Sequence, residues 1–217
     1  MPSLEIGENI APVLTPDWVQ NDAGPIEQYR LLKGGTTIYT GPIPIPHTDA
    51  LFQLVANVTY QGAADYAEGP IKNDSDGNPY PTGRIPAGTI TSPAVVYEAQ
   101  RRAFFGALTG PAVPDAALIR LLTGALLNPV NGSVMVVNVP NGARGACFAY
   151  PLSVRAPTSI MQVSINIDVK AGFTGFSPVF SVQVPGANGF VPVDYRVIYM
   201  ITEFPFGGAG ETFTLTV

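Results

Sequence analysis

Apolar and polar residues alternate in short runs through residues 133–217, and turn-forming residues separate the runs. In the last run, Phe213, Leu215 and Val217 alternate with threonines. Because successive side chains of a strand point to opposite faces of the sheet, each run has one face suited to burial and one suited to water. The pattern predicts an antiparallel, jelly-roll-like sandwich with strands near residues 133–139, 144–150, 161–169, 178–184, 194–202 and 212–217.

The first 97 residues show a similar but less regular pattern. Strands are predicted near residues 11–19, 29–32, 37–39, 51–60 and 89–96, with a Gly34-Gly35 turn between the second and third. The prolines of residues 41–46 exclude a central strand there, because each removes a backbone donor. The spacing is typical of an immunoglobulin-like or fibronectin-like domain, although the chain has no cysteine pair. We therefore expect one β domain at residues 1–97 and a second at 98–217.

One or two short helices are expected between these domains. Residues 97–108 place apolar side chains at helical spacings, although Gly106 weakens that prediction. A better helix follows Pro114, with leucines and Ala125 on one face, and Asn128-Pro129 ends it. The predicted fold class is mainly β, with two β-sandwich domains and one or two short helices between them.

The surface implied by the composition is neutral and rich in loops. Charged residues make up 12% of the chain, against about 25% in average globular proteins, while 23 glycines and 22 prolines are present. A soluble domain normally carries mixed charges on its surface, so this scarcity suggests that other subunits cover part of it. We expect a homo-oligomer, with a trimer as one candidate.

Charge and hydropathy also exclude some classes of partner. The net charge is −5, and residues 1–97 hold four basic residues against ten acids. Such a chain lacks an extended basic surface for phosphates, so no nucleic-acid partner is expected. No run reaches the roughly 18 apolar residues of a membrane span, and residues 1–5 do not resemble a signal peptide. We expect neither membrane insertion nor export by the usual route. A virion protein, which is made in the host cytoplasm, would show the same features.

Residues suited to catalysis are few. His47 is the only histidine and lies in the proline-rich segment, and Cys147 lies in an apolar run, where a buried structural thiol is expected. Residues 73–78 cluster oxygen ligands around a glycine, but the later bidentate acid of a calcium loop is missing, so a solvated turn is preferred. We expect no catalytic residues, no metal and no cofactor, and hence a protein that is not an enzyme.

Aromatic residues in predicted loops are the remaining candidates for a binding site. Exposed aromatic rings can stack on sugars, whereas buried ones form the core or a subunit interface. An oligomer or partner interface is favoured for the phenylalanines near glycines and Pro205, namely Phe173, Phe176, Phe190, Phe204 and Phe206. Candidate glycan contacts are Trp18, Tyr66 and Tyr80.

An ordered set of short motifs in the second half resembles a known family. The motifs are Ile119-Arg120-Leu121, Asn128-Pro129-Val130-Asn131-Gly132, Phe148-Ala149-Tyr150-Pro151, Val184-Pro185-Gly186-Ala187-Asn188-Gly189-Phe190 and Asp194-Tyr195-Arg196-Val197-Ile198-Tyr199. Together they resemble the C-terminal domain of a group of tailed-bacteriophage structural proteins, over about residues 114–217. The resemblance implies a non-enzymatic, oligomeric virion component in which the N-terminal domain attaches or decorates and the C-terminal domain mediates contacts.

The resulting hypothesis is a virion structural protein, most readily a fibre, tail-tip or adsorption-apparatus component. Its partners would be copies of itself, other virion proteins and a host-surface glycan. One alternative is a capsid decoration or head-fibre protein. A second alternative, from another class, is a carbohydrate-binding module.

Overall fold

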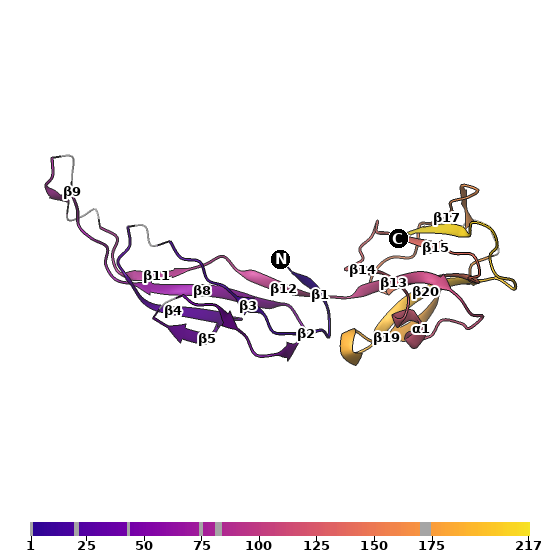
Figure 1. Cartoon of the computed structure of the whole chain (residues 1–217), viewed down its shortest axis with the longest axis horizontal. Helices are drawn as coiled ribbons and strands as arrows, with labels where there is room; N and C mark the ends of the chain where they lie inside the picture. Colours follow the sequence, from indigo (N-terminus) through magenta and orange to yellow (C-terminus); the bar gives the residue numbers. More distant parts are fainter. Residues whose placement is uncertain (1, 20–21, 43, 74–75, 81–83, 170–174) are drawn as a thin grey trace. The chain divides into compact units, whose positions relative to one another are not determined.

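The computed structural model describes residues 2–19, 22–42, 44–73, 76–80, 84–169 and 175–217, and its fold is mainly β, of the sandwich class. The chain divides into two compact units (Figure 1). The first unit contains the residues up to Ser3 and Asn9–Ala99, and the second contains Leu4–Glu8 and Gln100–Val217. The short segment Leu4–Glu8 therefore belongs with the second unit, which the sequence pattern did not indicate.

The first unit is built on a sheet of order β1-β12-β8-β4-β5, with β11 also paired to β8. The strands of this sheet are β1 (Ser3–Glu5), β4 (Ile26–Lys33), β5 (Thr36–Gly41), β8 (Val58–Tyr66), β11 (Gly88–Thr91) and β12 (Val95–Gln100), of which Leu4, Glu5 and Gln100 are counted with the second unit. Three two-stranded ladders accompany it: β2 (Asn9–Ile10) with β7 (Phe52–Gln53), β3 (Val13–Leu14) with β6 (His47–Thr48), and β9 (Lys72–Asn73) with β10 (Pro79–Tyr80).

The core of the first unit lies on one face of that sheet. Tyr29 is opposite Ala64 in the ladder between β4 and β8, and Leu31 is on the same face; all three are buried. Beside this core, Asp49 accepts hydrogen bonds from Lys33 Nζ at 2.8 Å and from Tyr60 Oη at 2.6 Å. Burial acts to raise the pKa of Asp49, but these hydrogen bonds outweigh it, so the pKa is lowered.

Several predictions for this part of the chain are wrong. Of the strand predicted at 11–19 only the two residues of β3 are extended in a ladder, and the strand predicted at 89–96 is divided between β11 and the start of β12. The predicted strand at 51–60 is divided into β7 and the start of β8 by a bend. The predicted helix at 97–108 is the end of β12 followed by β13 (Arg102–Leu108). β13 is paired on both edges and covered on both faces, so apolar residues occur on both of its faces and imitate helical spacing.

The second unit is a sandwich of a five-stranded sheet, order β14-β13-β16-β20-β19, and a four-stranded sheet, order β15-β21-β17-β18. The remaining strands are β14 (Gly124–Leu127), β15 (Val134–Val139), β16 (Gly145–Pro151), β17 (Ser159–Gln162), β18 (Ile167–Asp168), β19 (Phe180–Val184), β20 (Val193–Ile201) and β21 (Glu211–Thr216). These strands confirm most of the predicted ones.

Two buried clusters hold this unit together. The first fills the space between the two sheets and includes Met135, Phe148 and Phe213. The second lies on the opposite face of the five-stranded sheet, where Cys147 is buried together with Ile119 of the helix α1 (Ala116–Arg120). Figure 1 shows α1 on the side of β13 and β20 that faces away from β15 and β17. The central strand β16 is consequently buried along its whole length.

The helix predicted after Pro114 is present but short. Asp115 caps it by accepting a hydrogen bond from the Leu118 N–H at 2.8 Å. Ala125, expected on the helix, lies instead in β14, which approaches β13 so closely that a Cβ on Gly124 would lie 2.4 Å from the Phe105 ring. No helix in the described residues is long and apolar enough to cross a membrane.

The strand predicted at 161–169 is a second correction in this unit. A turn at residues 163–166 divides it into β17 and β18, and Asn166 adopts a φ of 53° in that turn. Asparagine tolerates this left-handed conformation better than most residues. Glu211 supports the turn by accepting hydrogen bonds from Ser164 and Gln162. As a result Val163 and Ile165 are exposed rather than buried.

Candidate interaction surfaces

The two residues considered for nucleophilic or acid-base chemistry are held in structural positions. His47 lies in β6, where its ring packs on that of Tyr39 with 5.1 Å between the centroids. Cys147 is fully buried in β16, and burial raises the pKa of its thiol to about 12. The expectation of a buried structural thiol is confirmed, and this thiol cannot reach a substrate in the folded protein.

Acidic residues provide no evident metal site in the described part of the chain, where no group of three His, Cys, Asp or Glu side chains could hold an ion. The segment at 73–78 considered for calcium lies partly outside the described residues.

The structure brings together two of the three candidate glycan contacts. Trp18 and Tyr66 have ring centroids 6.3 Å apart, and Trp18 also packs against the core of the first unit. Trp18 borders a hollow of about 280 Å³ whose other lining includes Asp17, Tyr29 and Ser92. Tyr80 lies in β10, outside this group, and its side chain is not among the described ones. Trp18 and Tyr66 therefore share one surface region with a hollow beside it.

The phenylalanines predicted for an interface occupy different environments. Phe176 and Phe206 pack edge-on against Phe213, with centroids 5.3 Å and 6.4 Å away, and so they close the core between the two sheets. Phe204 is 74% exposed. Phe173 lies outside the described residues. Among the members of this group that the structure describes, Phe204 is the side chain most exposed to a partner.

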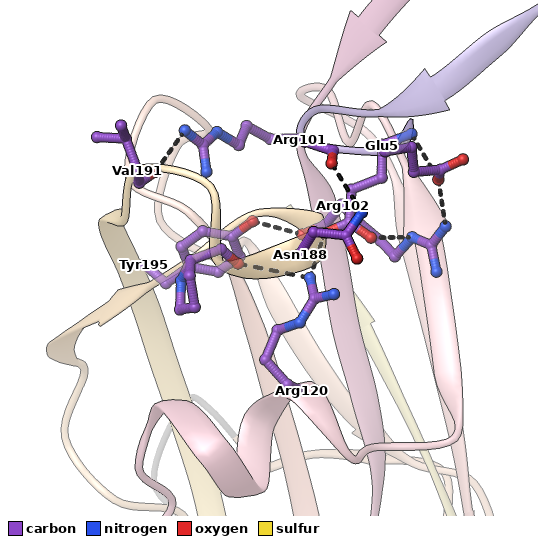
Figure 2. A network of polar contacts seen from close by, with 10 residues as sticks. Glu5, Arg101, Arg102, Arg120, Asn188, Val191 and Tyr195 are labelled. Atoms are coloured by element: carbon purple, nitrogen blue, oxygen red, sulfur yellow. Dashed lines mark hydrogen bonds and ion pairs between the residues drawn. The ribbon is translucent and has the colours of Figure 1, made fainter. Parts of the chain in front are cut away.

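Figure 2 shows a polar cluster around Glu5 from close by, and Phe190 adjoins it through Arg101. The Phe190 ring lies 5.6 Å from the guanidinium of Arg101. The Glu5 carboxylate is almost fully buried and forms ion pairs with Arg120 and, at 3.3 Å, with Arg102 Nε (Figure 2). The Arg120 guanidinium also lies 4.8 Å from the Phe104 ring centroid. Burial of this carboxylate is thus compensated by two positive charges.

Backbone contacts fix the same N-terminal segment to the loop of residues 185–190. The Ala187 N–H donates to the Ile6 carbonyl at 2.9 Å, and Asn188 Nδ2 donates to the Gly7 carbonyl at 3.0 Å. Gly7 has a φ of 96°, and a Cβ there would lie 2.2 Å from the Ala187 carbonyl oxygen. The glycine-rich motif in this loop therefore holds residues 4–8 against the rest of the second unit. The cluster around Glu5 is structural.

A further candidate surface, with little charge, is the solvent side of the four-stranded sheet in the second unit, which we call the outer face. The ladder registers place Val136 opposite Thr214, and Thr214 opposite Met161. Two valines of β15 are about half exposed, Val134 at 52% and Val136 at 47%. The residues of the outer face are Val134, Val136, Asn138, Ser159, Met161, Asp168, Thr212, Thr214 and Thr216. Those contributed by β15, β21 and β17 are uncharged, and Asp168 of β18 lies at the far edge of the sheet from β15.

The exposed turn between β17 and β18 extends this surface. The Val163 N–H donates to the Thr212 carbonyl at 2.9 Å, so the turn lies at the end of β21, where Val163 and Ile165 are exposed. The outer face was not predicted from the sequence. Its signal there is a threonine-rich strand and a valine-rich one, both without charge in their outward positions.

Comparisons with known proteins add no relative: no protein-family model matches the chain, and neither the curated proteins nor the solved structures give a match.

Proposed function

We propose that this protein is a non-enzymatic structural component of the virion of a tailed bacteriophage, built into a fibre, a tail tip or an adsorption apparatus as a homo-oligomer. The observation that carries the proposal is the ordered set of motifs by which the second half of the chain resembles such proteins. In the structure these motifs occupy α1, β16, β20 and the loop at 185–190. They include turns whose backbone needs Asn or Gly, such as Asn128 at a φ of 52° and Gly132 at 93°.

The outer face supports the assembly part of the proposal. Exposed valines beside threonines, with no charge in the outward positions of β15 and β21, suit a surface that another subunit covers. The inaccessibility of Cys147 and the packing of His47 on Tyr39 support a role without catalysis. Binding and assembly are the functions for which these surfaces are suited.

Quantitative mass spectrometry of purified particles tests this proposal. The expected result is that the chain is present at a low copy number relative to the major capsid protein, as a tail component would be. A copy number comparable with that of the capsid protein would instead support the alternative of a capsid decoration or head-fibre protein. Absence of the chain from infectious particles would overturn both.

A second function is favoured by the hollow beside Trp18. Aromatic rings next to polar groups such as Asp17 and Ser92 are the usual composition of a sugar subsite. A glycan array with the purified chain would identify a carbohydrate-binding module. Trp18→Phe should then weaken binding, whereas Phe204→Leu, in the second unit, should leave it unchanged; loss in both variants or in neither would argue against this site.

A further inference from the structure

The strand β15 forms an unprotected edge of the four-stranded sheet. In the described part of the chain its only strand neighbour is β21. Edge strands in soluble proteins are usually short, charged or interrupted by proline, because their free backbone groups otherwise pair with other chains. β15 has six residues, VMVVNV, none of which is charged or proline. It therefore lacks the usual protection against pairing.

The ladder shows which backbone groups are free. The Val217 N–H donates to the Ser133 carbonyl at 3.0 Å, and the Val163 N–H to the Thr212 carbonyl at 2.9 Å. Odd residues of β21 thus bond toward β15 and even ones toward β17, since bonding direction alternates along an antiparallel strand. The register places odd residues of β15 opposite odd residues of β21, so the backbone groups of the odd residues of β15 form hydrogen bonds to β21. The N–H and C=O groups of Val134, Val136 and Asn138 point to the open edge.

We propose that β15 pairs antiparallel with β15 of a second copy of this chain, across a two-fold axis at Val136, and so joins two four-stranded sheets into one. This inference rests on the homo-oligomeric part of the proposed function, but not on the location of the protein on a particle. A two-fold contact places each residue opposite a residue of the same surface. An uncharged strand meets no repulsion in that arrangement.

The free groups select the register. Pairing centred on Val136 places Val136 opposite its own copy and Val134 opposite Asn138 of the second copy, so that every outward-bonding residue of β15 has a partner. If the two-fold axis lay one residue further along, at Val137, Val134 would face Pro140 of the second copy, which has no N–H to donate. Val134 and Val136 of both copies then adjoin on the outer face, where their exposed methyl groups are partly withdrawn from water.

A cysteine scan tests the register directly. The two Cα atoms at position 136 would be about 5.5 Å apart, which is within the range for a disulfide. The two Cα atoms at position 134 would be displaced by four residues, or roughly 13 Å along the strands. Under mild oxidation Val136→Cys should form a covalent dimer and Val134→Cys, which is equally exposed, should not. The native Cys147 does not interfere, because it is fully buried.

Two further variants test the pairing itself by analytical ultracentrifugation. Val136→Pro removes an N–H that the fold does not use and also fixes φ at that position, and Val136→Lys places two positive charges opposite each other. Each should raise the dissociation constant of the dimer by at least about tenfold, while Val136→Thr, which keeps the N–H and the shape, should not. A monomeric wild-type chain, or an oligomer that neither Val136→Pro nor Val136→Lys weakens, would overturn the proposal, as would equal cross-linking at 134 and 136. Near-ultraviolet circular dichroism of both the proline and the lysine variants serves as the control that each is folded.

Discussion

The cluster around Glu5 predicts that removing the charge of the acid and removing the two arginines reduce the stability of the second unit by different amounts. The Glu5 side chain is 4% exposed, whereas those of Arg102 and Arg120 are 34% and 27% exposed. If Glu5 loses its charge, both arginines can still be hydrated. If the arginines are removed, a carboxylate stays buried with no positive charge beside it. The second change should therefore destabilise the second unit much more than the first.

The magnitudes follow from this difference in burial. Glu5→Gln keeps a hydrogen-bond acceptor and should cost about 1–2 kcal/mol, since a charge-assisted hydrogen bond is replaced by a neutral one. The double change Arg102→Met with Arg120→Met should cost about 3–5 kcal/mol, the usual result of leaving a buried charge unpaired. Adding Glu5→Gln to the double variant should restore part of the lost stability, because the unpaired charge is then gone.

The chain contains two natural reporters for the measurement. Cys147 is the only cysteine and is buried in the second unit, so its reaction with a thiol reagent in urea follows unfolding of that unit. Trp18 is the only tryptophan and lies in the first unit, where its fluorescence serves as the internal control. The reasoning is refuted if Glu5→Gln lowers the urea midpoint of Cys147 labelling as much as the double arginine variant does, or if the triple variant is the least stable of the three.

Three other changes have defined outcomes. Gly7→Ala should destabilise the second unit by about 1–3 kcal/mol in the same labelling assay, because the new Cβ needs both a strained φ and room that a facing carbonyl occupies; an unchanged midpoint would contradict the close packing of Gly7 against Ala187. Phe213→Ala should cost about 3–5 kcal/mol there, since this ring is 1% exposed within the core, and a loss below 1 kcal/mol would contradict its central position. Asp49→Asn should destabilise the first unit at pH 7. Because folding lowers the pKa of Asp49, its contribution is present above the ordinary carboxyl pKa of about 4 and is lost as the pH falls through the lower folded value. Wild type and variant, compared by Trp18 fluorescence in urea, should therefore converge in acid, and a difference that persists at pH 2 would contradict this assignment.

The elements that could be predicted from the sequence are those whose cause is local. The strands β15 and β21 follow from alternation between turn residues, while β16 and the burial of Cys147 follow from an apolar run that begins after the turn at residues 140–142. The short helix follows from the Pro114-Asp115 start and its capping bond. In each case the deciding interactions lie within a few residues.

The features that could not be predicted depend on distant contacts. The placement of residues 4–8 depends on Arg102, Arg120 and the loop at 185–190, about 100 residues or more away in the sequence. β13 looked helical because both of its faces are covered, and alternation cannot reveal burial on two sides. The run at 161–169 alternates like a strand, yet the turn at Asn166 and its support by Glu211 prevail over the pattern.

The same distinction applies to the candidate sites. Aromatic residues near glycines were expected at an interface, but Phe176 and Phe206 are needed to close the core against Phe213, a role visible only when the sheets are assembled. The outer face arises from the pairing of β15 with β21, two strands from separate parts of the sequence.

The proposed function is tested most directly by immunogold labelling of purified virions from the source of this chain, with antibody raised against the folded protein. The account predicts label at the tail end of the particle. Label distributed over the head would contradict the tail assignment and support decoration of the capsid. Virions that bind no antibody at any position would contradict a virion role altogether.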